Sequence, residues 1–168
     1  MNRLFPATVS LLSLLVSGLA TSAPAVAPSP DEAGIQAVIT QFQSTLKAKN
    51  ETGLVQLFTS KEAPITASAS DEAFRLVRTK KADAPKVMDS TGGKFASQMA
   101  ASKSAVEEQF SNVKIDSDGA AAAVSFDFVF LADGEPANLG KEAWLLVKTL
   151  DGWKISAIVY SIHFPQKT

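Results

Sequence analysis

The sequence predicts an α+β domain in which N-terminal helices pack on one face of an antiparallel sheet. Apolar residues recur at helical spacing in the first part of the chain, whereas after Ser104 they recur at every second position. Asp-Gly pairs, which favour tight hairpin turns, separate the apolar runs of this second part. Helices followed by an antiparallel meander are typical of α+β domains.

Residues 1–23 are predicted to be a secretory signal peptide. Arg3 precedes an apolar stretch from Ala7 to Leu19, which is shorter than the about 20 residues needed to span a membrane. Small residues follow, and we expect cleavage between Ala20 and Ala27. The alternative is a buried N-terminal helix. The rest of the chain divides into a tether, 24–30, and a single domain, 31–166, which we expect in the periplasm of a bacterium or secreted from it.

Composition excludes several classes of function. The chain has no cysteine and one histidine, so disulfides, cysteine-linked lipid anchors and a zinc site are not expected. Its 16 basic and 17 acidic residues nearly balance, which argues against nucleic acid as a partner. We therefore expect no metal, no cofactor and no membrane attachment after signal removal.

Helix signals are strongest at the start of the domain. Ser29, Pro30 and Glu32 make a capping box with proline at the first helical position, which predicts a helix over 30–49. A shorter helix is predicted over 51–59. The first helix carries one apolar stripe, formed by Ile35, Val38, Ile39, Phe42 and Leu46.

The middle of the chain mixes short elements. A short strand is predicted from Pro64 to Ala67, and a helix follows from Ser70 to Lys80 with acidic residues first and basic residues last. A loop is predicted over 82–93, and a helix from Lys94 to Lys103.

The last third predicts strands. Val113 and Ile115 alternate with polar residues before an Asp118-Gly119 turn, and a run from Val124 to Phe130 alternates in the same way. A longer loop is predicted from Asp133 to Gly140. Strands over 141–149 and 153–164 then flank the pair Asp151-Gly152.

This order of elements resembles the nuclear transport factor 2-like superfamily, also called SnoaL-like or cystatin-like. The resemblance implies a cone, in which a curved antiparallel sheet wraps around the helices. The superfamily includes isomerases, dehydratases, polyketide cyclases and assembly domains, so the fold alone implies no activity. The resemblance rests on the segments Leu46–Asn50, Phe126–Phe130, Glu142–Trp144, Asp151–Ile155 and Val159–Ser161.

A two-residue Asp-Gly loop would fix the register of the last hairpin. Trp144 would then lie opposite Val159, and Glu142 opposite Ser161. The resemblance implies that the face with Trp153 lines the cone and that the other face packs in a homodimer. The first face would carry Glu142, Trp144, Leu146, Trp153, Ile155, Val159, Ser161 and His163, and the second Leu145, Val147, Ile158, Tyr160 and Ile162.

The far end of the inward face predicts a ligand site, because polar groups there converge on an apolar pocket. Its members would be Phe42, Glu142, Trp144, Ser161 and His163. Glu142 in such a pocket could have a raised pKa and act as an acid or base, as in ketosteroid isomerase, whose fold this resembles. The alternative is that Glu142 and His163 lie at a strand end, solvated or paired with each other.

Two further features have two interpretations each. Asp127 either faces the cone as a buried carboxylate or faces outward as an ordinary polar residue. The basic cluster Arg75, Arg78, Lys80 and Lys81 either meets an anion or is a solvated helix end.

The preferred hypothesis is an exported domain that binds a small apolar ligand, or serves as an accessory domain, without catalysis. The second is a cofactor-independent isomerase, lyase or hydrolase that uses Asp127, Glu142 or His163 for acid–base chemistry. The third is a protein–protein module that binds through Ile158, Tyr160 and Ile162.

Overall fold

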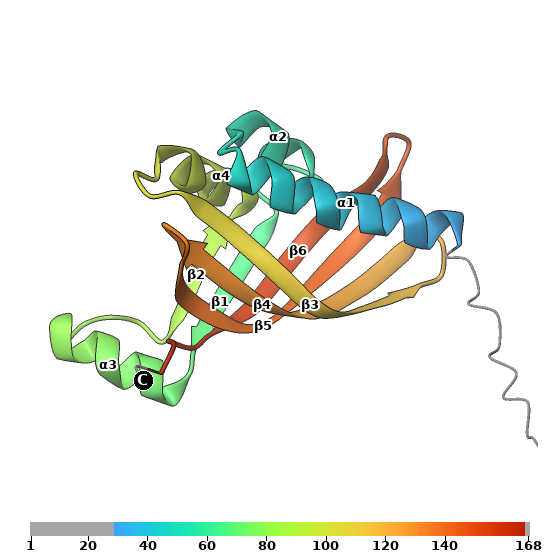
Figure 1. The fold of residues 1–168 in the computed structure, drawn as a ribbon. Helices are drawn as coiled ribbons and strands as arrows, with labels where there is room; N and C mark the ends of the chain where they lie inside the picture. The colour runs from blue at the N-terminus through green and yellow to red at the C-terminus, as the bar shows by residue number, and fades with distance from the viewer. Residues whose placement is uncertain (1–28, 167–168) are drawn as a thin grey trace, which may run out of the picture.

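The computed structural model describes residues 29–166, so the predicted signal peptide and most of the tether lie outside the described residues. Helices come first and long strands last, as predicted (Figure 1). The helices are α1 (Pro30–Lys47), α2 (Glu51–Gln56), α3 (Asp71–Lys80) and α4 (Gly92–Ala101). The strands are β1 (Pro64–Ala69), β2 (Val87–Thr91), β3 (Val106–Ser117), β4 (Ala121–Ala132), β5 (Glu135–Thr149) and β6 (Gly152–Ile162). None of these helices is long and apolar enough to cross a membrane.

The six strands form one curved sheet in the order β2-β1-β6-β5-β4-β3. Neighbouring strands are antiparallel except β1 and β6, which run parallel. Helices α1, α2 and α4 lie along the concave side of the sheet, whereas α3 lies apart from them beside the C-terminus (Figure 1). The result is the α+β domain that the sequence pattern predicts, in the form of the cone that the resemblance implies.

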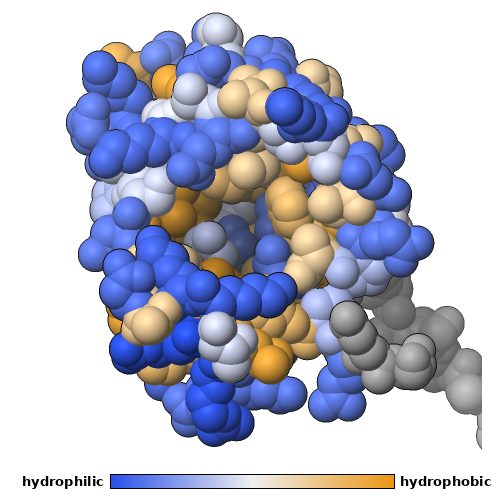
Figure 2. All heavy atoms as spheres, turned by 90° about the vertical axis from the view of Figure 1, so that its left-hand side faces the viewer, coloured by the Kyte–Doolittle hydropathy of each residue, from blue (hydrophilic) through white to orange (hydrophobic). Residues whose placement is uncertain are grey.

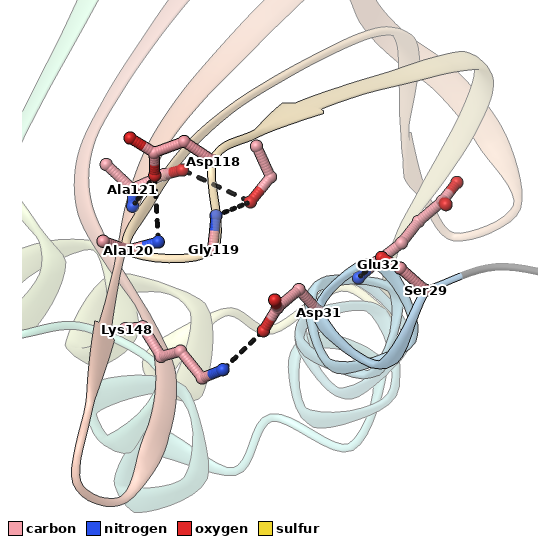
Figure 3. A network of polar contacts seen from close by, with 9 residues as sticks. Ser29, Asp31, Glu32, Asp118, Gly119, Ala120, Ala121 and Lys148 are labelled. Carbon is pink, nitrogen blue, oxygen red and sulfur yellow. Dashed lines mark hydrogen bonds and ion pairs between the residues drawn. The ribbon is translucent and has the colours of Figure 1, made fainter.

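Helix α1 forms as the capping box predicts. The Ser29 hydroxyl accepts a hydrogen bond from the Glu32 N–H at 3.1 Å, and the predicted apolar stripe is buried. Asp31 in the first turn forms an ion pair with Lys148 of β5 at 2.5 Å, which ties the start of the helix to the sheet (Figure 3). The same view shows the β3–β4 turn, where the Asp118 carboxylate accepts the N–H groups of Ala120 and Ala121.

Two predicted loops are strands in the structure. Residues 82–93 contain β2, which pairs with β1 at the sheet edge and is largely exposed, so it lacks the apolar alternation by which buried strands are recognised. The predicted loop from Asp133 to Gly140 is a tight turn followed by the start of β5. Asp133 and Gly134 both have positive φ (54° and 84°), as a two-residue hairpin turn requires.

The register predicted for the last hairpin is wrong. Thr149 pairs with Gly152, so the loop residues are Leu150 and Asp151, not Asp151 and Gly152. A bulge in β6, opposite the step from Leu145 to Leu146, then shifts the register again. A one-residue shift moves every later side chain to the other face of a strand.

The bulge reverses the predicted faces beyond it. Trp144 lies opposite Ile158, and Glu142 lies opposite Tyr160. Ile158 is 5% exposed and belongs to the core, whereas Val159 is 54% exposed on the outer face. The prediction that Ile158 and Tyr160 face outward and Val159 inward is therefore wrong, while Trp153 and Ile155 are inside as predicted.

The core is aromatic at its centre. Trp144 is fully buried, and its ring lies 4.8 Å from Phe42 of α1 and 5.1 Å from Phe126 of β4, measured between centroids. Phe110 of β3 closes the group at 5.7 Å from Trp144. Such ring pairs fix α1 against the middle of the sheet.

Candidate functional site

A cavity of about 170 Å³ remains between the helices and the concave side of the sheet. Figure 2 shows the end of the molecule where α4 lies, hollowed and rimmed largely by hydrophobic side chains. The apolar lining comes from α1, α4, β1, β4 and β6, and the polar lining from α4, β3, β5 and β6. The polar residues are Gln98, Glu108, Asn138, Glu142 and Tyr160, and the apolar ones are Phe42, Ile65, Phe95, Met99, Phe128, Phe130 and Ile158.

Glu142 lies on the inner face of β5 and is 6% exposed. Trp144, two residues on and therefore on the same face, donates its indole N–H to Glu142 Oε1 at 2.5 Å. Burial raises the pKa of Glu142 to about 7, although the indole hydrogen bond favours the charged form and opposes this rise. The alternative in which Glu142 is solvated at a strand end is therefore wrong.

Glu108 lies on β3 and is also 6% exposed. Its main-chain carbonyl accepts a hydrogen bond from Gln43 at 3.0 Å, but within the described residues its carboxyl group has no hydrogen bond. Burial, and next the negative charge of Glu142, raise the pKa of Glu108 well above its usual value. The two carboxyl groups therefore interact across the cavity that both of them line.

Glu108 is not among the predicted site residues, because the sequence pattern predicts a strand there only from Val113 onward. The alternation of Val106, Glu108 and Phe110 could have revealed it. Val106 is 4% exposed and Phe110 packs against the core, so the residue between them at period two faces inward as well.

Tyr160 of β6 is the third titratable group of the cavity. Its ring meets Phe128 edge-on, with centroids 5.8 Å apart. Burial raises the pKa of Tyr160, and the charges of Glu142 and Glu108 raise it further. Tyr160 thus contributes a phenol to the cavity, because the β6 bulge turns it inward.

The structure brings together only part of the predicted ligand set. Phe42 and Glu142 line the cavity, and Trp144 lies fully buried against Glu142. Ser161 lies on the other side of the sheet, where its hydroxyl accepts the N–H of Lys141 at 3.0 Å. His163 is exposed near α3 and does not meet Glu142. The bulge explains both differences, since it reverses the face of every residue beyond it.

Asp127 faces outward, which was one of its two predicted positions. Its carboxylate forms an ion pair with Lys141 and accepts a hydrogen bond from Asn112 Nδ2 at 2.6 Å. These hydrogen bonds, with the Lys141 charge, lower the pKa of Asp127. An ionised, solvated carboxylate on the outer face contributes nothing to the cavity.

The basic cluster lies at the exposed end of α3. Arg78 stacks over the ring of Phe74, with its guanidinium carbon 5.4 Å from the ring centroid, and the other basic side chains are solvated. Across residues 29–166, no three His, Asp or Glu side chains come together in a way that could hold a metal ion.

Known structures share this architecture. No protein-family model matches the chain, and no curated protein matches it in sequence. A protein of unknown function with a cystatin-like fold from Nostoc punctiforme superposes with a TM-score of 0.56 at 11% identity, covering 81% of this chain and 93% of that one. An NTF2-like superfamily protein from Salmonella enterica gives 0.53 at 19% identity, with coverages of 80% and 90%.

A third structure, from Streptomyces avermitilis, is provisionally named a dehydratase of the NTF2-like family. It superposes with a TM-score of 0.55 at 16% identity and covers 79% of this chain and 96% of that one. These matches define the class of architecture, a helix-filled cone of antiparallel strands. The chain has the NTF2-like, or cystatin-like, fold.

Proposed function

We propose that the protein binds a small molecule inside the cone, with the polar end of that molecule at Glu108 and Glu142. The observation that carries the proposal is the placement of two carboxyl groups, each 6% exposed, on one otherwise largely apolar cavity. Burying an acid without a cationic partner costs free energy. Buried acids with perturbed pKa values in a cavity are therefore candidates for function.

The cavity limits the size of the ligand. Its volume, about 170 Å³, is close to that of the ~150 Å³ apolar cavity that holds benzene in a protein core. Drug-sized ligands occupy pockets of about 300–1,000 Å³. The proposed ligand is therefore a molecule about as large as one aromatic ring with a short substituent.

Native mass spectrometry of the purified protein tests the proposal. We expect a fraction of the protein to carry a small molecule, and Met99→Trp, which fills the cavity, to abolish this adduct. Leu150→Trp is the matched control, because Leu150 is fully exposed at the hairpin tip. Adducts that persist equally in both variants, or their absence from the native protein, would contradict the proposal.

Acid–base catalysis is the second candidate, and the raised pKa values of the two buried glutamates favour it. Near neutral pH, Glu142, with a pKa of about 7, is partly protonated and partly ionised. A group that titrates near the working pH can donate and accept a proton, as acid–base catalysis requires. Asp127 and His163 lie elsewhere and take no part in this candidate.

Turnover separates catalysis from binding. The molecule recovered from the protein is incubated with fresh protein and followed by mass spectrometry. Conversion that Glu142→Gln abolishes would support the enzyme, whereas recovery of the molecule unchanged would reject it.

We also propose that the protein is exported and forms a homodimer through the outer face of the sheet. The exposed side chains of Leu145 (56%) and Val159 (54%) on the outer face support the homodimer. Ile158 and Tyr160 cannot form the contact surface, because both face the cavity. Sedimentation equilibrium should give a dimer that Leu145→Lys dissociates.

The mass of the protein recovered from the periplasm or medium tests export, and it should show cleavage between residues 20 and 27.

A further inference from the structure

We propose that the ligand of the cone carries a positive charge, an ammonium group that sits between Glu108 and Glu142. This inference rests on the proposed function and narrows it to one chemical class, small organic amines in their protonated form. It follows from the acidic side chains and hydrogen-bond acceptors that line the cavity, and from the absence of a cationic side chain among the described lining residues.

Within residues 29–166, no lysine, arginine or histidine lines the cavity. The titratable groups among its lining residues are Glu108 of β3, Glu142 of β5 and Tyr160 of β6. The parts contributed by α1, α4, β1 and β4 are apolar or amide side chains. Each of these titratable groups is neutral or negative, so a positive charge that balances an ionised carboxylate in the cavity would come from a ligand.

The outer carboxylates show how this protein balances charge elsewhere. Within residues 29–166, four ion pairs join a lysine to an acidic side chain, and Glu108 and Glu142 are in none of them. Buried charges in proteins are normally paired. Exposed acids without a lysine are solvated by water, whereas Glu108 and Glu142 are each 6% exposed and have neither a lysine within the described residues nor free access to water. This is the arrangement expected where a ligand supplies the partner.

Hydrogen bonding favours an ammonium group as well. Trp144 donates to one oxygen of Glu142, and the described residues donate to none of the other three carboxyl oxygens of the pair. Within residues 29–166, the side-chain nitrogen or oxygen atom that is both fully buried and without a hydrogen-bond partner is Trp153 Nε1. The three carboxyl oxygens are not fully buried in this sense, so they are open to the cavity that the two glutamates line. An ammonium group has three N–H donors and no acceptor, which suits a site of acceptors.

The aromatic lining accommodates the remaining part of such a ligand. Phe42, Phe128 and Tyr160 contribute rings to the cavity. Ring faces attract cations, and the interaction strengthens when the cation is desolvated. A benzene-sized amine would place its ring against these side chains and its ammonium group against the carboxylates.

Binding of a cation should release a proton. Without a ligand, protonation neutralises the buried acids, and an ammonium group would replace the proton on Glu142. Since the pKa of Glu142 is about 7, its ionised fraction rises about tenfold between pH 6 and pH 8. The affinity for a cation should rise by about the same factor, while the affinity for a neutral ligand should not.

The test uses three probes of equal size and different charge: benzylamine, which stays cationic at both pH values, benzyl alcohol and benzoate. Isothermal titration calorimetry at pH 8 should show benzylamine binding at least tenfold more tightly than benzyl alcohol, and no binding of benzoate. At pH 6 the benzylamine affinity should fall about tenfold. Its binding heat should also vary with the ionisation heat of the buffer, because a proton is released.

Isosteric variants locate the effect. Glu108→Gln and Glu142→Gln should each weaken benzylamine binding at pH 8 more than they weaken benzyl alcohol binding, and Glu142→Gln should also remove the dependence of benzylamine affinity on pH. Asp127→Asn, on the outer face, is the matched control, and thermal unfolding checks that each variant folds.

Two results would overturn the inference, and only the second would also reject the proposed ligand site. If benzyl alcohol or benzoate binds as tightly as benzylamine, the cation preference is wrong and the cavity remains a ligand site. If none of the three probes binds, the cation preference fails together with the proposed benzene-sized site.

Discussion

Glu107 and Glu108 are consecutive residues of β3 with opposite environments. Glu107 forms an ion pair with Lys47 at 2.7 Å, and hydrogen bonds from Lys47 and Gln109 lower its pKa. Glu108 points to the other side of the strand, has no cationic partner in the part of the chain that the structure describes, and has a pKa raised by burial. The face of the strand, rather than the position along the chain, decides the electrostatics of a carboxyl group here.

The same contrast recurs across the middle of the sheet. Asp127 and Lys141 pair on the outer face of β4 and β5, and Glu142, next to Lys141, is buried on the inner face. Glu107 and Asp127 each pair with a lysine, whereas within the described residues Glu108 and Glu142 pair with none. The proposed ligand site rests on this difference between the concave and the convex side of the sheet.

The largest expected effect tests the contrast in packing between the two faces. Trp144 and Leu145 are neighbours on β5, the first fully buried and the second 56% exposed. Trp144→Ala removes the ring at the centre of the core and should lower the free energy of unfolding by about 3–5 kcal/mol. Leu145→Ala should change it by less than about 0.5 kcal/mol. Urea unfolding measures both, and similar losses in the two variants would show that the faces are assigned wrongly.

The next effect is the dependence of stability on pH. Burial raises the pKa of Glu142 from 4.5 to about 7, so between these values the folded protein binds more protons than the unfolded chain. Stability is therefore highest at low pH in this window and falls as the pH rises through about 7. From pH 5 to pH 8 the free energy of unfolding should decrease by about 2–3 kcal/mol through Glu142 alone.

Urea unfolding at the two pH values, with Glu142→Gln as the comparison, measures this effect. The variant has no carboxyl group at this position and should lose the part of the dependence that Glu142 causes, whereas Glu108, whose pKa burial also raises, keeps its own part. The outer acids have lowered pKa values, so their contributions change below about pH 4 and do not enter the window. Stability that rises from pH 5 to pH 8 would show that Glu142 is not buried in solution.

The order of helices and strands could be predicted because periodicity is a local property of the sequence. The stripe of α1 placed Phe42 inside, and alternation placed the strands that follow Ser104. The position of Ser161 and His163 could not be predicted in this way, since it depends on a bulge in β6, where the Ser156 hydroxyl donates to the carbonyl of Leu145 at 3.0 Å. An Asp-Gly pair favours a turn but does not say which two residues form its loop.

Glu108 could not be recognised as part of the site for a related reason. Its inward position follows from the alternation of β3, but its meeting with Glu142 depends on how strongly the sheet curves between β3 and β5. Gly140 contributes to the shape of β5 there, because a Cβ atom at this position would overlap the carbonyl oxygen of Ser161 on β6. A glycine in a strand indicates such a close approach without naming the partner.

The smallest expected effect is at the outer ion pair. Asp127→Asn removes a charge that Lys141 and Asn112 surround at the solvated surface, where ion pairs contribute little and salt screens them. The thermal midpoint at pH 7 should move by no more than the error of the measurement, at low and at high salt, and benzylamine binding should not change. A drop as large as that of a buried residue would mean that Asp127 is enclosed in solution, for example beneath a second copy of the chain on the outer face. Repeating the measurement with Asp127→Asn in the Leu145→Lys background, where that contact would be broken, shows whether a second copy encloses Asp127. If a dimer covers Asp127, the effect of Asp127→Asn should vanish in this background.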